Sequence, residues 1–258
     1  MKKNFKVWQI FALMVAIPIG LSSEVNGDVL WNNGSMVTHP GLGAGGADVS
    51  MASVVPNSAG SNVTATAWRA DNFSVGGPGW LVDSIQTFAY DTNNPTPRFG
   101  EAFIRIHAND GGAPGSILTS SNATWEYSGI NRIFNGEGNL LNSARQVQRI
   151  TANFGGFALG PGDYFFSFSV SNTAGVNNWF PYVMDINPDD ANNPITRVGN
   201  SFGSGNSGET WAPLNVGTGD WNQSPEIPFV ISGTAIPEPT SCVLFILGMG
   251  VAMSRRKK

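Results

Sequence analysis

Short segments in which apolar and polar residues alternate, each closed by turn-forming residues, recur along this 258-residue chain and constrain its fold most. Residues 163–170 (DYFFSFSV) follow a Gly-Pro-Gly turn and repeat an apolar residue at every second position from Tyr164 to Val170. Residues 99–107 (FGEAFIRIH) show the same period around Ile104. A period of two puts the apolar side chains of a strand on one face. The pattern predicts an all-β fold, and specifically a single jelly-roll-like β-sandwich.

Turn signals divide the middle of the chain into several such segments. Gly-Gly-Pro-Gly at 76–79 and the run NDGGAPG at 109–115 are typical of chain reversals. Many short strands separated by such turns are typical of a sandwich. The expected strands cover residues 63–75, 80–90, 99–107, 123–134, 163–170, 179–184 and 227–233.

Residues 139–150 (NLLNSARQVQRI) fit two patterns. Leu140 and Ala144 lie four positions apart, as on one face of a helix, whereas residues 145–149 alternate as in a strand. We expect a strand here, with a short helical turn near Leu140 as the alternative.

The stretch 28–236 has the size of one all-β domain and an acidic balance. It contains no lysine, seven arginines and sixteen acidic residues, so its net charge is about −9. A surface of this sign repels polyanions, which argues against a nucleic-acid partner. The one cysteine, Cys242, lies outside this stretch, so the domain has no intramolecular disulfide and must gain its stability from apolar burial.

Residues 1–27 have the layout of a secretory signal peptide. Three lysines precede an apolar run at 7–19, and small or polar residues follow it. We expect cleavage after Gly27, with cleavage after Ser23 as a second option. The alternative is an N-terminal membrane anchor that is retained.

The last 22 residues, 237–258, combine three physically different pieces. A rigid polar spacer comes first, then an apolar run at 242–253, then a cluster of cations at the chain end. The apolar run is shorter than the roughly 20 residues that span a bilayer comfortably as a helix, and the cations would stay on the cytoplasmic side. The spacer is Pro237, Glu238 and Pro239, and the cations are Arg255, Arg256, Lys257 and Lys258.

This layout resembles the PEP-CTERM sorting signal of Gram-negative bacteria, which an exosortase recognises near the Pro-Glu-Pro spacer. The resemblance implies that the general secretion machinery exports the chain and that its hydrophobic segment, a short transmembrane helix, holds it transiently in the inner membrane. Processing by the exosortase would then deliver residues 28–236 to the cell surface, the extracellular matrix or a biofilm.

A second resemblance concerns the domain itself. Residues 68–73 (WRADNF) and 80–85 (WLVDSI) are similar to the "ADDF" and "WTIDSI" stretches of uncharacterised bacterial secreted sandwich domains. Residues 159–164 (LGPGDY) are similar to their "LPAGTYW" corner. This resemblance implies the sandwich fold and assigns no activity.

The motif content predicts no catalytic residue. A glycosidase needs two carboxylates placed across a sugar, and Glu101, Glu126 and Glu137 are the central glutamates. The two histidines are His39, in a Gly-rich segment, and His107, which we expect to be exposed at a strand end beside a turn. The chain has no Gly-x-Ser-x-Gly elbow to supply a nucleophile and too few ligands for a typical zinc site. A secreted glycoside hydrolase stays as an alternative.

One acidic loop could hold a structural calcium ion. Asp185, Asn187 and Asp189 supply oxygen atoms at alternate positions, like the start of a calcium loop. An EF-hand would need glycine at position 190 and an acid at position 196, where this chain has Asp190 and Thr196. This loop is therefore interpreted either as a looser calcium site or as a solvated turn. No other cofactor is expected.

Carbohydrate binding is the most specific alternative to a purely structural role. Trp179, Trp211 and Trp221 lie in Gly/Asn-rich stretches, where a tryptophan can be exposed and stack on a sugar ring. Packing under loops is the other interpretation of these three residues. We therefore expect a surface or matrix protein with a structural or adhesive role, or else a module that recognises extracellular polysaccharide.

Overall fold

The computed structural model describes residues 27–52, 60–92, 94, 96–134, 139–185, 195–215 and 224–238. Apart from a three-residue 3-10 turn, η1 (Ala44–Gly46), and 3-10 conformation at Asn139, the regular structure described there is β-strand. The longer strands are β4 (Trp68–Val75), β5 (Trp80–Asp91), β6 (Phe99–Asp110), β7 (Ala113–Ile133), β8 (Gln146–Leu159), β9 (Gly162–Asn172) and β15 (Phe229–Ala235). The shorter ones are β1 (Asp28–Asn32), β2 (Asp48–Met51), β3 (Ser61–Val63), β10 (Asn178–Phe180), β11 (Met184–Asp185), β12 (Ile195–Thr196), β13 (Phe202–Ser204) and β14 (Ala212–Pro213).

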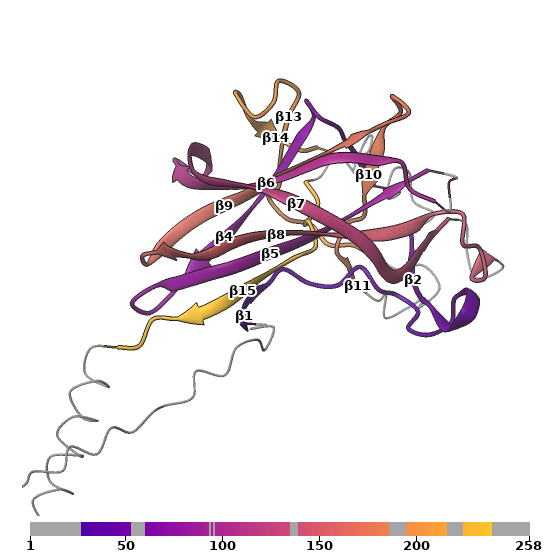
Figure 1. Cartoon of the computed structure of the whole chain (residues 1–258), viewed down its shortest axis with the longest axis horizontal. Coiled ribbons are helices and arrows are strands. Elements are labelled where there is room, and N and C mark those ends of the chain that lie inside the picture. The colour runs from indigo at the N-terminus through magenta and orange to yellow at the C-terminus, as the bar shows by residue number, and fades with distance from the viewer. Residues whose placement is uncertain are drawn as a thin grey trace, which may run out of the picture.

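Strand β7 joins two layers into one hydrogen-bonded sheet, and Figure 1 shows it running between them. The strand order is β1-β15-β5-β8-β7-β6-β9-β4-β13-β14. The first part of β7 pairs with β6 up to the Ala102–Ala123 pair. From Ala123 onward it pairs with β8, as far as Asn131. The sheet therefore bends along β7 and brings its two halves face to face.

The core lies between these two halves. The ring of Phe229, on β15, lies 4.0 Å from that of Phe166, on β9, although several strands separate β15 from β9 in the sheet order. Phe73 of β4 also packs edge-on against Phe229, with 6.4 Å between ring centroids. Both contacts cross from one layer to the other. The all-β sandwich predicted from the alternation is confirmed.

The β6–β7 hairpin shows how local sequence sets the geometry. Gly111 and Gly112 form its two-residue turn with φ values of +62° and +90°, which favour glycine because a Cβ would be strained there. The Asn109 side chain accepts a hydrogen bond from the Gly112 N–H at 2.7 Å. The run of turn residues therefore places the reversal where the sequence predicted it.

Three expectations about strands need correction in detail. Residues 123–134 are not separate strands, because they belong almost entirely to β7, which is 21 residues long. Residues 139–142 form the short helical turn near Leu140 that was the alternative, in which the Asn142 N–H donates to the Asn139 carbonyl at 2.8 Å, and the expected strand begins only at Gln146. Residues 179–184 are divided between β10 and β11.

The first and last strands of the domain lie side by side. β1 pairs antiparallel with β15, with Asp28 opposite Gly233. Residues 1–26 and 239–258 lie outside the described residues, so the signal peptide, the apolar run and the four terminal cations stay predictions. Pro237 and Glu238 follow β15 and are exposed. In the described ranges no helix reaches the length and hydropathy that a membrane crossing requires.

Candidate functional site

The three tryptophans expected to bind sugar do not form a common site among the described residues. Trp179 is half-buried and packs against a small cluster that includes Met36 and Tyr90. Trp211 is half-buried, with its ring edge-on to His107 at 5.7 Å. Trp221 lies outside the described residues. Their roles as carbohydrate contacts stay predictions, while the packing of Trp179 and Trp211 against neighbouring side chains is observed.

Two aromatic residues of β7 are exposed instead. Trp125 is 39% exposed and Tyr127 is 41% exposed, and both point to the same face because they are two positions apart. Successive same-face residues of a strand are about 7 Å apart. We call this pair the aromatic strip.

The aromatic strip is exposed because the two layers diverge at this point. The β6–β7 pairing ends at Ala102–Ala123, so Trp125 has no β6 partner, although it is paired with Ile150 of β8. One edge of the Trp125 ring packs against Phe99 at 5.5 Å, which fixes the indole and leaves part of it open.

One polar contact adjoins the aromatic strip, and an ion pair lies on the other face of the same strand. The Tyr127 hydroxyl donates to the Asn131 side-chain oxygen at 3.2 Å. On the opposite face of β7, Glu126 accepts from the Arg149 guanidinium at 2.5 and 3.1 Å. Both partners of this ion pair are well exposed, so it adds little to stability. An aromatic surface that also carries the Tyr127 hydroxyl is an arrangement that can receive a sugar ring and its hydroxyls.

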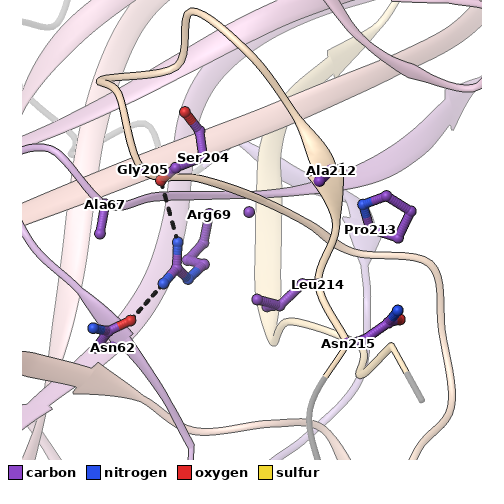
Figure 2. Close-up of a pocket in the computed structure, with 10 residues that line it drawn as sticks. Asn62, Ala67, Arg69, Ser204, Gly205, Ala212, Pro213, Leu214 and Asn215 are labelled. Carbon is purple, nitrogen blue, oxygen red and sulfur yellow. Dashed lines mark hydrogen bonds between the residues drawn. The ribbon is translucent and has the colours of Figure 1, made fainter. Parts of the chain in front are cut away.

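A second feature is a hollow of about 430 Å³ near the β13–β14 edge of the sheet. We call it the Arg69 pocket; the turn between β3 and β4 and the β13–β14 hairpin line it. Figure 2 shows the Arg69 guanidinium in its wall, with Leu214 and Asn215 across the hollow. Arg69 is opposite Phe168 in the β4–β9 register, so it extends toward the inner side of the layer.

The guanidinium of Arg69 is held by neutral groups. Its nitrogens donate to the Trp68 carbonyl at 2.7 Å, the Asn62 side-chain oxygen at 2.5 Å and, more weakly, the Ser204 carbonyl at 3.4 Å. Arg69 is only 7% exposed. Burial lowers the pKa of Arg69 to about 10, and it therefore stays protonated at neutral pH.

Two carboxyl groups meet between the layers. Asp71 is fully buried, and its oxygens accept from the Ile227 N–H and the Asn72 N–H, both at 2.8 Å. The Asn33 amide bridges it to Glu226, with bonds of 3.2 and 2.6 Å. Burial, reinforced by the charge of Glu226, raises the pKa of Asp71 well above its ordinary value. The pair ties β4 to the segment before β15, and Asp71 has no exposed surface where a substrate could reach it.

The three central glutamates considered for glycoside hydrolysis are placed differently. Glu101 is exposed on β6, and Glu126 is bound to Arg149. Glu137 lies outside the described residues. A catalytic pair among these three glutamates is therefore not observed in the part of the chain that the structure describes.

His107 is not at an exposed strand end, and that expectation is wrong. β6 continues to Asp110, and the imidazole lies on the strand face opposite to that of Ile106, where it is fully buried and packs against the Trp211 ring. Its two ring nitrogens lie 2.8 Å from the Ser167 hydroxyl and 3.1 Å from the Gly115 carbonyl. Burial lowers the pKa of His107. A carbonyl stands where a triad has a carboxylate, and Ser167 is also fully buried, which is typical of a structural pair.

The expected calcium loop is only partly described. Asp185 accepts from Arg197 at 2.6 Å, and this cation competes with a metal ion for the carboxylate. Asn187 and Asp189 lie outside the described residues. Within the described part, no three His, Cys, Asp or Glu side chains gather closely enough to hold a metal. The calcium site stays a prediction.

No protein-family model and no curated protein sequence matches this chain. Among solved structures, it is similar to the crystal structure of the cysteine protease and lectin-like domains of Cwp84, a surface layer associated protein of Clostridium difficile, with a TM-score of 0.41 and 12% identity. The likeness covers 67% of this chain, and the chain spans about a third (33%) of that protein. A likeness at this level says nothing about activity or ligand.

Proposed function

We propose that this chain is an exported, exosortase-processed protein of the cell surface or extracellular matrix, whose sandwich adheres to extracellular polysaccharide through the aromatic strip. The observation that carries the binding function is the exposure of Trp125 and Tyr127 on one face of β7. An apolar surface of this kind on a secreted domain is suited to binding, because contact with a ligand removes it from water.

The strip has the chemistry that sugar rings require. The C–H face of a pyranose can pack on an indole or phenol ring, and Tyr127 also presents a hydroxyl. Two rings about 7 Å apart on a strand can contact neighbouring parts of one extended chain. Because one edge of Trp125 is already fixed on Phe99, little side-chain entropy is lost on binding.

The export part of the proposal is supported by the two ends of the sequence. A basic and apolar start precedes residue 28, and the Pro-Glu-Pro spacer, apolar run and basic cluster follow residue 236. The secretion machinery and an exosortase are the partners this implies. The acidic balance of residues 28–236 suits a soluble surface outside the cell and not a nucleic-acid ligand.

Retention on polysaccharide tests the binding function. The chain purified from its host is passed over immobilised extracellular polysaccharide, beside the Trp125→Ala/Tyr127→Ala variant. We expect the column to retard the parent protein and the double variant to elute without retardation. Ile117→Ala is the matched control, because Ile117 is also an exposed residue of β7 (49%) but lies at its other end.

Equal retention of the parent and the double variant would remove the aromatic strip from the binding function. The same incubations are assayed for reducing ends, because their release would identify a glycoside hydrolase. We expect none, since the proposal assigns the sandwich an adhesive and not a catalytic role.

A further inference from the structure

We propose that the Arg69 pocket binds the carboxylate of an acidic sugar residue, a hexuronate, in an extracellular polysaccharide. The proposal rests on the proposed function for the polysaccharide that carries the sugar, but it concerns a different site from the aromatic strip. The strip would hold the chain of sugars, and the pocket would select the charged ones.

The first observation is that the buried guanidinium of Arg69 has no negatively charged partner among the described residues. Among the residues the structure describes, no carboxylate forms an ion pair with Arg69, and its printed hydrogen bonds go to two carbonyls and an amide oxygen. Its Nε–H is buried and has no hydrogen-bond partner there. A buried charge is stabilised only when it is paired and hydrogen-bonded, so this guanidinium is suited to an incoming anion.

The second observation is that the space beside the guanidinium is kept open. Gly203 of β13 is opposite Arg69 in the sheet, and a Cβ there would lie 3.4 Å from the Arg69 Nη1 and 3.2 Å from a Leu214 methyl. Any larger side chain at position 203 would extend over the guanidinium. The missing side chain therefore leaves the cation accessible from the pocket.

The rest of the lining suits a sugar better than a bare ion. Leu214 and Pro213 give the pocket an apolar wall, while the Asn62 and Asn215 amides can bond hydroxyl groups. The volume of about 430 Å³ is in the lower part of the range for small-ligand sites. A guanidinium also matches the planar geometry of a carboxylate.

Charge favours a singly charged ligand. The domain as a whole carries a net charge of about −9, so a multiply charged anion is repelled before it reaches the single cation of the pocket. An isolated uronate residue among neutral sugars carries one negative charge, whereas a continuous run of uronates is a polyanion and is repelled as nucleic acid is. The pocket is therefore better matched to uronate than to inorganic phosphate.

Titration calorimetry tests the site with defined probes: methyl glucuronide, methyl glucoside, sodium acetate and inorganic phosphate. With the full chain we expect methyl glucuronide to bind at least tenfold more tightly than each of the others. Equal affinity for the glucoside would refute the charge recognition. Acetate or phosphate binding as tightly as the glucuronide would refute the sugar assignment.

Two variants assign the binding to the pocket. Gly203→Val should abolish binding of the glucuronide by covering the guanidinium, and Arg69→Gln should do so by removing the charge. Because Arg69 is buried, the Arg69→Gln variant could fail to fold. The backbone at position 203 is not left-handed, so a valine is tolerated there and the Gly203→Val variant is the decisive test of binding in the pocket. Undiminished binding by a folded Gly203→Val protein would overturn the proposal.

Separate variants distinguish binding at the aromatic strip from binding in the Arg69 pocket. The Trp125→Ala/Tyr127→Ala variant should bind methyl glucuronide like the parent, because the strip lies on another part of the sheet. Gly203→Val should keep its retention on neutral polysaccharide. Loss of both activities in either variant would contradict the separation of the two sites.

Discussion

Replacing Asp71 by asparagine should remove a pH dependence from the stability of the sandwich. Asp71 is fully buried beside Glu226, and burial followed by the charge of Glu226 raises the pKa of Asp71 well above its ordinary value of 3.8. The folded protein therefore holds a proton that the unfolded chain releases. The stabilisation is complete at pH values below 3.8 and is lost as the pH rises toward the raised pKa of the folded state.

The size of the effect follows from linkage. Between the two pKa values, the free energy of unfolding should fall by up to about 1.4 kcal/mol for each pH unit. The asparagine side chain of the variant cannot accept at both oxygen positions, so the N–H of either Ile227 or Asn72 then faces an amide NH₂. That mismatch costs about 1–3 kcal/mol at low pH. The variant should thus be less stable than the parent in acid and gain on it as the pH rises.

Urea unfolding followed by tryptophan fluorescence, from strongly acidic pH, below 3.8, to mildly alkaline pH, measures this difference. Asp91→Asn is the matched control with the opposite sign. Burial of Asp91 opposes its ionisation, but the hydrogen bonds and charge of Arg98, at 2.7 Å, outweigh this effect and lower the pKa of Asp91. Its stabilisation is present above 3.8 and is lost as the pH falls through the lowered pKa. A free-energy difference between Asp71→Asn and the parent that does not change with pH would refute the reasoning.

Phe229→Ala should lower the free energy of unfolding by about 3–5 kcal/mol in urea titrations, because it leaves a cavity against Phe166; a loss below about 1 kcal/mol would contradict the two-layer core. Gly112→Val should cost roughly 1–3 kcal/mol because its φ is +90°, whereas Gly160→Ala, in open space, should cost much less. Intact mass of the exported protein should show loss of residues 1–27 and of the tail beyond the Pro-Glu-Pro spacer. Neutralising the four terminal cations should release unprocessed protein, while alanine in the spacer should leave the chain in the membrane; normal processing of both variants would exclude a sorting signal.

The alternation of apolar residues predicted the fold well, because a buried strand face requires a period of two. The pattern around Phe166 is an example, and so is the turn at Gly111 and Gly112. What the pattern did not contain was the pairing of β7 with both β6 and β8, since pairing depends on strands that are distant in sequence. The burial of His107 against Trp211 was missed for the same reason.

The candidate sites were harder to predict. Trp179 and Trp211 lie in Gly/Asn-rich stretches, which suggested exposure, yet those segments pack their indoles against other side chains. Trp125 lies in a segment predicted only to be a strand, and its exposure arises because β6 diverges from β7 there. One signal for the Arg69 pocket was present: Arg69 shares a strand face with Phe73, and a charged residue on an apolar face needs a partner.

Retention of the chain by the polysaccharide matrix of its own host tests the proposed function most directly. Matrix freed of protein is incubated with the purified chain, and the unbound fraction is measured by absorbance. We predict that the matrix removes the parent and the Ile117→Ala control from solution and leaves the Trp125→Ala/Tyr127→Ala variant unbound. A parent protein that stays wholly in solution, or a double variant that binds as well as the parent, would contradict the binding role of the aromatic strip.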